Sequence, residues 1–233
     1  MRAILINMNQ SENDLEVPKS SWWRQWMDSC LSAIALLLLS PLLLVIAVSI
    51  FLETGLPIVF SQSRVGRNGE LFRLLKFRTM RHGASGPPVT VGGDRRVTHV
   101  GHFLRKFKLD ELPQLWNIVC AQMSIVGPRP EVPEFVDLCK PVWQSVLRVR
   151  PGITDPASIA FHQEEKLLAK SSDPIRYYRE ALLPAKLAMN IAYLQERTLW
   201  LDFQVVLRTV LCAAFPGKLD TQQASLLAPE DPK

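Results

Sequence analysis

The chain has 233 residues, enough for one or two domains with a well-buried core. Hydrophobic residues make up 48% of the sequence and charged residues 21%, a balance that excludes a disordered or low-complexity chain. The net charge is +5, and the four cysteines form no CxxC pair. A disulfide scaffold and a structural zinc site are therefore not expected.

The first element predicted along the chain is an apolar helix in a membrane. Residues 29–52 carry no charge and are bounded by Asp28 and Glu53. A straight helix of this length extends about 36 Å, enough to cross a hydrocarbon core of about 30 Å. Three tryptophans within residues 22–26 precede the run, where they suit either an interfacial anchor or a protein core.

The middle of this run bears on how the helix sits in the membrane. Pro41 removes the hydrogen bond to the carbonyl of Leu37 and bends the helix, and the hydroxyl of Ser40 is a candidate partner for that carbonyl. Basic residues flank the run on both sides, so neither flank is expected to be translocated. A helix that enters, bends at Pro41 and returns satisfies both observations, and a single-pass helix with a tolerated proline remains the alternative.

The segment that follows is strongly basic. Residues 53–109 hold 11 basic and 3 acidic side chains, a net charge of +8 that attracts phosphates. Within this block, residues 57–80 predict a β-hairpin, because Asn68 and Gly69 supply the positive φ angles of a tight turn between two apolar runs. Residues 82–93 are rich in glycine and proline and predict a loop.

A short helix is predicted over residues 109–119. Pro113 is tolerated only in the first turn, which places Asp110 and Glu111 at the helix N-terminus, where the helix dipole favours anions. The two acids are consistent with a simple capping role and also with a catalytic one. The apolar positions recur at helical spacing and predict a buried stripe formed by Leu112, Leu115, Trp116 and Val119.

Three later segments complete the pattern. Pro128 and Pro130 hold Arg129 in a stiff extended segment, which suits presentation of a guanidinium to an anionic ligand and is also typical of a rigid turn. Residues 173–197 predict a solvated amphipathic helix. Residues 199–215 are strongly apolar and too short for a good span, so they either lie in the membrane interface or complete the core.

These motifs, in this order, resemble the bacterial sugar transferase family, whose small members are monotopic phosphoglycosyl transferases. The resemblance covers roughly residues 20–215. Beside the apolar segment with its central Ser40-Pro41, it rests on residues 62–66, 76–80, 94–98, 101–106, 109–114, 123–131 and 151–154.

The resemblance implies an α+β, mostly helical fold with a re-entrant membrane helix and a compact cytoplasmic catalytic domain that holds a small β-hairpin. The domains would be a flexible N-terminus at 1–20, the interfacial and re-entrant helix at 21–56, the catalytic domain at 57–215 and a flexible tail at 216–233. It also implies transfer of a phosphosugar from a UDP-sugar to undecaprenyl phosphate with release of UMP and with Mg²⁺ as cofactor. This reaction would be the first membrane step of exopolysaccharide, O-antigen or glycoconjugate assembly, at the cytoplasmic face of the bacterial inner membrane.

Site residues carry over by position. Asp110 would attack the sugar-linked phosphorus and form an aspartyl intermediate, and Glu111 would hold Mg²⁺. Charge on the phosphates would be offset by Lys76, Arg78 and Arg105. The nucleotide would meet Pro128, Arg129 and Pro130.

One stretch departs from the family pattern. After Thr154, where many members carry an arginine that would reach phosphate, this chain reads Asp155-Pro156 and continues to His162 without one, so His162 or Arg150 is a candidate substitute. The basic block also leaves a second function open, a membrane-tethered binding or scaffold protein without catalysis. Nucleic acid is not expected as a partner, because no recognised nucleic-acid motif is present.

Overall fold

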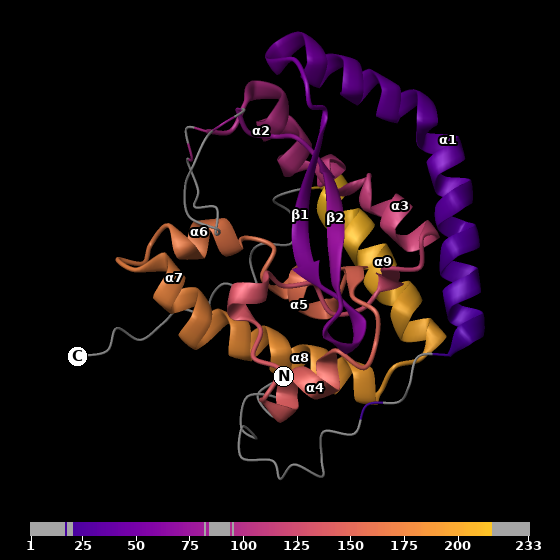
Figure 1. Cartoon of the computed structure of the whole chain (residues 1–233), viewed down its shortest axis with the longest axis vertical. Coiled ribbons are helices and arrows are strands. Elements are labelled where there is room, and N and C mark those ends of the chain that lie inside the picture. Colours follow the sequence, from indigo (N-terminus) through magenta and orange to yellow (C-terminus); the bar gives the residue numbers. More distant parts are fainter. Residues whose placement is uncertain (1–16, 18–20, 82, 84–93, 95, 216–233) are drawn as a thin grey trace.

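The computed structural model describes residues 17, 21–81, 83, 94 and 96–215. Within them the chain is mostly helical, with two small sheets set among the helices (Figure 1). The predicted α+β, mostly helical class is therefore confirmed. The predicted flexible N-terminus, the loop at 82–93 and the flexible tail at 216–233 lie almost wholly outside the described residues.

The elements follow one another closely along the chain. The strands are β1 (Val59–Val65), β2 (Leu71–Phe77), β3 (Ser124–Val126) and β4 (Gly152–Thr154). The α-helices are α1 (Trp22–Thr54), α2 (His99–Lys106), α3 (Gln114–Val119), α4 (Pro141–Val146), α5 (Pro156–Ala160), α6 (Glu164–Leu168), α7 (Pro174–Tyr177), α8 (Leu183–Gln195) and α9 (Leu199–Ala214). Single turns of other helix types are η2 (Arg67–Gly69), η3 (Leu109–Glu111), η4 (Pro133–Phe135) and η5 (Tyr178–Leu182).

Helix α1 contains the whole predicted apolar run. It follows one edge of the molecule and then turns across the top (Figure 1), with Pro41 inside the helix. Ser40 Oγ donates to the carbonyl of Leu37 at 2.8 Å, as the sequence predicted for the carbonyl that Pro41 leaves free. The middle of α1 is uncovered, since Leu37 and Leu38 are each about three-quarters exposed. By length and composition α1 is able to cross a membrane.

The predicted hairpin is confirmed. Strands β1 and β2 pair antiparallel, from Val59 opposite Phe77 to Val65 opposite Leu71. The turn between them uses positive φ angles at Asn68 (56°) and Gly69 (82°), which is why these residue types stand there. Because the two strands are fully paired, the side chains of β2 are held in fixed positions.

A second, parallel pair brings two distant glycine-containing segments together. Ser124 and Val126 of β3 lie opposite Gly152 and Thr154 of β4. A Cβ placed on Gly152 would lie 2.2 Å from the backbone nitrogen of Gly127, so only glycine fits there. This close approach fixes the start of the Pro128–Pro130 segment against β4.

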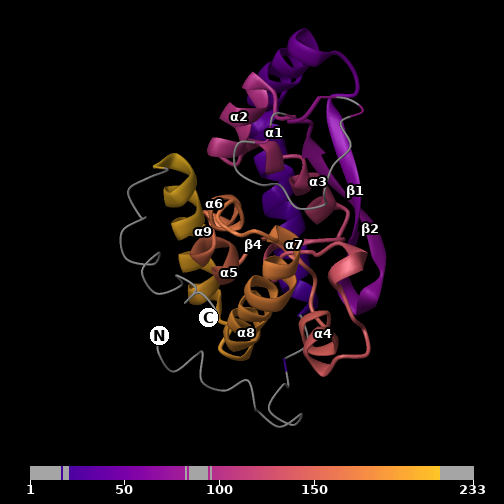
Figure 2. The ribbon, with the colours of Figure 1, turned by 90° about the vertical axis from the view of Figure 1, so that its left-hand side faces the viewer.

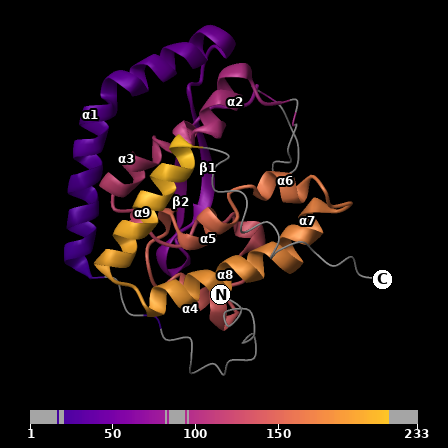
Figure 3. The same ribbon diagram turned by 180° about the vertical axis from the view of Figure 1, so that it is seen from behind.

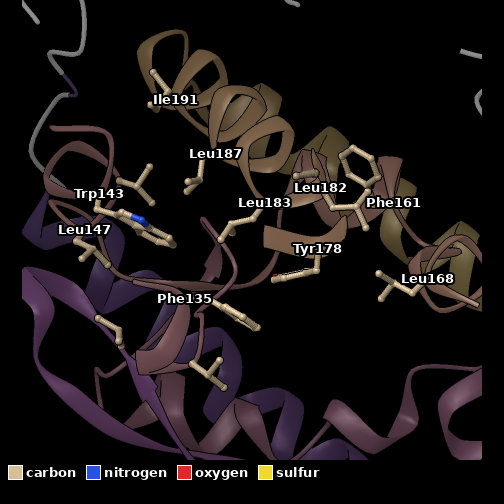
Figure 4. Packing of buried hydrophobic residues seen from close by; sticks show 14 residues of the cluster. Phe135, Trp143, Leu147, Phe161, Leu168, Tyr178, Leu182, Leu183, Leu187 and Ile191 are labelled. Carbon is tan, nitrogen blue, oxygen red and sulfur yellow. The ribbon is translucent and has the colours of Figure 1, made fainter. Parts of the chain in front are cut away.

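The main hydrophobic core lies under the C-terminal helices (Figure 4). Residues 174–195 form α7, the π-helical turn η5 and α8, and not a solvated amphipathic helix as predicted. One face of this unit is buried because Tyr178, Leu182 and Leu187 pack against Phe135 and other core residues. The prediction of helix was right, whereas the prediction of solvation was wrong because the unit carries more apolar side chains on one face than the balanced charges suggested.

The buried stripe predicted on residues 109–119 is wrong at Trp116, whereas Leu112 and Leu115 are partly buried against core clusters. Trp116 is 55% exposed, and the buried side chains of α3 are those of Gln114, Asn117 and Ile118. Asn117 explains the difference, because its side chain accepts from the backbone N–H of Leu75 and donates to the carbonyl of Arg73. The inward face of α3 thus binds the backbone of β2 through polar groups, which apolar periodicity does not detect.

Candidate active site

Asp110 and Glu111 lie in the turn η3, directly before α3 and so at its N-terminal end, as the sequence predicted. Two residues after the end of α2, Lys108 adopts a left-handed conformation (φ 56°) and serves as the N-cap of this turn. Pro113 then occupies the N-cap position of α3. Both acids are buried, with 7% and 8% of their surface exposed. Buried carboxylates require partners or a chemical role.

Glu111 joins two cationic side chains from different parts of the fold. Its Oε1 accepts from Lys76 Nζ at 2.9 Å and from Arg129 Nη2 at 2.5 Å, and its Oε2 accepts from Arg129 Nη1 at 3.3 Å. Lys76 is on β2 and Arg129 follows β3, so the site is assembled from the hairpin, the turn η3 and the segment after β3. Three of the residues predicted from the sequence therefore meet in one cluster.

Electrostatics separates the two acids. Burial raises the pKa of Glu111, but the positive charges of Arg129, Lys76 and Lys108 outweigh it and hold that pKa well below its usual range. Burial and the negative charge of Glu111 raise the pKa of Asp110. Adjacent carboxylates with pKa values pushed in opposite directions are typical of catalytic pairs.

Asp110 differs from its neighbour because one of its oxygens has no partner. Its Oδ1 is fully buried without a hydrogen bond from the described residues. An unpaired buried carboxylate oxygen is costly for a folded protein, so its presence calls for an explanation. A ligand or a metal ion that reaches Oδ1 supplies one.

The Arg129 segment is rigid because its backbone is bonded on both sides. The carbonyl of Pro128 accepts from Gly152 N at 2.9 Å, and the carbonyl of Pro130 accepts from Arg64 Nη1 at 3.1 Å. The pKa of Arg129 is raised, chiefly by the charge of Glu111. Its side chain is still 32% exposed, so it is able to meet a ligand while it is paired.

Arg78 and Arg105 are not among the cations that pair with Glu111. Arg78 Nη2 donates to the carbonyls of Thr54 and Gly55 and to Thr54 Oγ1, so Arg78 binds the C-terminal end of α1. Arg105 Nε donates to Thr79 Oγ1, and its Nη1 lies 3.3 Å from Glu165 Oε1. The charge of Arg105 nevertheless opposes part of the rise in the pKa of Asp110, after the larger effects of Lys76 and Lys108.

The segment that departs from the family pattern, which begins at Asp155, stabilises the charged form of Arg129 electrostatically. Asp155 is fully buried and caps α5, accepting from Ser158 N at 2.7 Å and Ser158 Oγ at 2.9 Å. Its negative charge also raises the pKa of Arg129. Sequence reasoning missed this residue, although an aspartate directly before a proline is a helix-start signal, with the aspartate as N-cap and the proline at the first helical position.

For the two substitutes suggested for the missing arginine, the described contacts are with groups other than the dyad. His162 Nδ1 lies 3.1 Å from the carbonyl of Ile159, within its own turn. Burial lowers the pKa of Arg150, and the charged groups that act on it are Arg67 and Asp28. The cations brought to the dyad are those of β2 and of the segment after β3.

This arrangement sets a buried pair of carboxylates beside two cationic side chains and close to a long apolar helix. Comparison with known proteins agrees: the chain matches the bacterial sugar transferase family over residues 19–215 and belongs to that family. It is 36% identical over 213 residues to the UDP-N-acetylgalactosamine-undecaprenyl-phosphate N-acetylgalactosaminephosphotransferase of Aeromonas hydrophila. That match covers 88% of this chain but 47% of the Aeromonas protein, so the chain spans about half the length of that relative.

Two shorter relatives align over more of their length. The UDP-glucose:undecaprenyl-phosphate glucose-1-phosphate transferase of Caulobacter vibrioides is 36% identical over 203 residues, covering 85% of this chain and 70% of that protein. The exopolysaccharide production protein ExoY of Rhizobium meliloti is 33% identical over 202 residues, a match that covers 78% of this chain and 81% of the Rhizobium protein. The predicted family is thus confirmed.

Proposed function

We propose that this protein is a phosphoglycosyl transferase that moves a sugar phosphate from a UDP-sugar to undecaprenyl phosphate. The observation that carries the proposal is the pairing of Glu111 with Lys76 and Arg129, next to the unpartnered Oδ1 of Asp110. Cations bring phosphates to the site, and Asp110 is the group left to react. The names of the relatives supply the substrate class, a UDP-sugar and a polyprenyl phosphate.

In the first step, Asp110 in its ionised form attacks the phosphorus that bears the sugar. A bond forms between the carboxylate oxygen and that phosphorus, and the bond to the bridging oxygen of the diphosphate breaks. UMP leaves with the electron pair of that bond, and the enzyme keeps an aspartyl-phosphosugar. Covalent capture divides the meeting of two anionic substrates into two separate events.

In the second step, an oxygen of undecaprenyl phosphate attacks the same phosphorus. The bond from phosphorus to Asp110 breaks, which frees the carboxylate and yields the polyprenyl diphosphosugar. Lys76 and Arg129 offset phosphate charge in both steps. The positive charge of Arg105 opposes part of the rise in the pKa of Asp110, and Pro128 and Pro130 keep Arg129 in place.

The dyad also fits Mg²⁺, which binds one or two carboxylates and completes its coordination with phosphate oxygens and water. The unpartnered Oδ1 of Asp110 and the carboxylate of Glu111, whose pKa is held low by its cationic neighbours, are oxygen donors of this kind. The described residues hold no group of three or more His, Cys, Asp and Glu side chains suited to a metal, so phosphate would have to supply further ligands. When bound, the ion would neutralise charge on the diphosphate, with Glu111 as its main protein ligand.

We also propose that α1 is re-entrant and that the catalytic body lies on the cytoplasmic face of the inner membrane. The bend of α1, the Ser40 hydrogen bond beside Pro41 and the basic residues on both flanks support this topology. Both ends of α1 also contact the same body, through Arg24 with Asp202 and through Thr54 with Arg78. A helix whose two ends meet one domain does not need to cross the bilayer.

The test is UMP release from a panel of UDP-sugars by the purified protein with undecaprenyl phosphate. Asp110→Asn is expected to abolish turnover without unfolding the protein, and Asp137→Asn, at an exposed aspartate, serves as the matched control. Incubation with donor alone should add the mass of the sugar phosphate at Asp110. Full turnover by the Asp110→Asn variant would refute the mechanism, and binding without UMP release would favour a non-catalytic scaffold.

A further inference from the structure

The buried face of α8 carries two polar side chains among its apolar ones. Leu183, Lys186, Leu187 and Asn190 are spaced three and four residues apart, so they share one face of the helix, and all four are buried. Asn190 is 4% exposed, and its Oδ1 has no hydrogen-bond partner among the described residues. An unpaired buried amide oxygen is costly, and a polar group that reaches it from outside the chain would remove that cost.

This face of α8 forms one wall of a small pocket next to the Arg129 segment. Helix α5 lies beside α8 in two views at right angles (Figure 2 and Figure 3), and the pocket is enclosed by these two helices and the Arg129 segment. Its charged and amide side chains are those of Arg129, Glu131, Asp155, Lys186 and Asn190. The pocket leaves about 10 Å³ for the centre of a water-sized group, which is room for one hydroxyl.

The two carboxylates of this pocket already have partners. Asp155 uses both of its oxygens to cap α5, and Glu131 Oε1 accepts from the hydroxyl of Tyr178 at 2.6 Å. Among these three acceptor side chains, Asn190 is therefore the one with an oxygen that the described residues leave unpaired. A ligand group that enters the pocket must bring a proton to that oxygen.

A hydroxyl group matches the pocket in both size and hydrogen bonding. It would donate to Asn190 Oδ1 and accept from a cationic wall, because a hydroxyl has one proton and two lone pairs. Lys186 suits the second contact, since its ammonium group donates to Glu164 Oε2 and has two further protons. An ionised phosphate or carboxylate carries no proton for Asn190, so an anion does not fit.

Arg129 connects this pocket with the dyad. Its guanidinium donates to both oxygens of Glu111, and the same residue lines the pocket. The negative charges of Asp155 and Glu164, on the pocket side, raise the pKa of Arg129 together with that of Glu111. A sugar nucleotide whose diphosphate meets Arg129 would thus bring its sugar and ribose hydroxyls near the pocket.

We infer that the pocket between α5, α8 and the Arg129 segment is a specificity subsite that receives one hydroxyl group of the sugar nucleotide, with Asn190 Oδ1 as its acceptor. The identity of the ligand rests on the proposed function, whereas the unpaired acceptor does not. A site built to bind a hydroxyl discriminates against an analogue that lacks it, because the protein group is then left unpaired. An acetamido group in the same position is larger than the space available.

The test measures equilibrium binding of UDP-glucose, the donor named for the Caulobacter relative, to the full chain in detergent. All proteins carry Asp110→Asn, so that no transfer follows binding. Asn190→Leu removes the amide and should raise the dissociation constant about tenfold, the worth of one hydrogen bond. Gln195→Leu, the same kind of change at the exposed end of α8, is the control and should bind as the parent does.

Equal dissociation constants for Asn190→Leu and Gln195→Leu would overturn the inference, because the pocket would then hold a structural water only. Absence of UDP-glucose binding by the parent would overturn it as well. Failure of the proposed function is a different result: the chain with Asp110 intact releases no UMP, while the weaker binding of Asn190→Leu remains.

Binding of UDP alone identifies the source of the hydroxyl. A ribose hydroxyl predicts equal losses for UDP and UDP-glucose in Asn190→Leu, whereas a sugar hydroxyl predicts a loss for UDP-glucose only. The analogue without that hydroxyl should bind the parent about tenfold more weakly and lose nothing further in Asn190→Leu, because the two changes remove the same contact. A second tenfold loss in Asn190→Leu would overturn the assignment to Asn190.

Thermal unfolding checks the fold of each variant. Asn190→Leu should melt at or above the temperature of the parent, because it removes an unpaired buried amide. If it melts lower, Asn190→Ala, which adds no bulk, takes its place and should show the same tenfold loss. Parent-like binding by Asn190→Ala would overturn the inference.

Discussion

At the scale of single residues, Glu111 is the most constrained group in the site. One carboxylate accepts from two cationic side chains that come from opposite sides of the dyad. It therefore holds Lys76 and Arg129 at a fixed separation whether or not a substrate is present. Under the proposed function, a phosphate that enters between them would find its charge partners already in place, which is the condition for electrostatic catalysis.

Removal of that charge should destabilise the protein. Glu111→Gln leaves Lys76 and Arg129 close together and unpaired, and we expect the free energy of unfolding to fall by ~3 kcal/mol, at the low end for breaking a buried pair because Arg129 is partly exposed. Denaturant unfolding in detergent measures it. Glu165→Gln, which breaks an exposed pair with Arg105, is the control and should cost less than about 1 kcal/mol. Equal losses in the two variants would contradict this account.

The pH dependence of turnover should report Asp110. Asp110 attacks only when ionised, and its pKa is raised by burial and by Glu111, so kcat/KM should fall on acidification at a higher pH than an ordinary aspartate would give. Because the charge of Lys76 lowers that pKa, Lys76→Met should move the acid limb to still higher pH. The quantity measured is the pH at which kcat/KM falls on the acid side of the profile, and not the maximum value of kcat/KM. A limb that stays in place in Lys76→Met, as it should in the exposed control Lys140→Met, would argue against Asp110 as the titrating group.

At the scale of elements, the site depends on contacts between short segments that have little structure alone. The strands β3 and β4 have three residues each, and they pair only because Gly127 and Gly152 allow the backbones to approach. This pair positions the Arg129 segment. Small backbone changes there should therefore reach the active site.

Gly152→Ala tests that dependence. The added Cβ would lie 2.2 Å from Gly127 N and 2.4 Å from Gly127 O, so the backbones must separate. We expect unfolding free energy to fall by about 2 kcal/mol or more, with loss of UMP release. Gly66→Ala, where the nearest atoms are 3.1 Å away, is the milder control. A Gly152→Ala variant as stable and active as the Gly66→Ala variant would contradict this account, because it would show that a Cβ fits between β3 and β4.

The bend of α1 gives a prediction at the same scale. Pro41→Leu restores the hydrogen bond to Leu37, after which Ser40 is not needed as a donor, and the straightened helix is long enough to span. Protease or tag accessibility in spheroplasts should then place the N-terminus outside, whereas the parent protein is expected to keep both flanks inside. The neighbouring Leu42→Ala leaves Pro41 in place and should keep the parent topology. An N-terminus already outside in the parent would rule out the re-entrant helix.

At the scale of the whole molecule, the sequence predicted those parts of the fold that depend on local patterns. The apolar helix, the Asn68-Gly69 hairpin and the positions of Asp110, Lys76 and Arg129 all follow from composition, turn chemistry or motif order. What escaped prediction depends on long-range contacts. The inward polar face of α3 exists because the side chain of Asn117 binds the backbone of β2. Arg78 binds the C-terminal end of α1 because β2 ends beside that helix.

Two linkages between α1 and the body have a further consequence. Near its start, Ser29 Oγ donates to the carbonyl of Ile118, and at its end Glu53 accepts from His99 N and Val100 N, the first groups of α2. Excising the hydrophobic segment to obtain a water-soluble enzyme would thus strip a cap from α2, orphan the guanidinium of Arg78 and uncover α3. Helix α1 is therefore packed into the structure of the catalytic domain itself, and crystallisation or screening efforts should retain it.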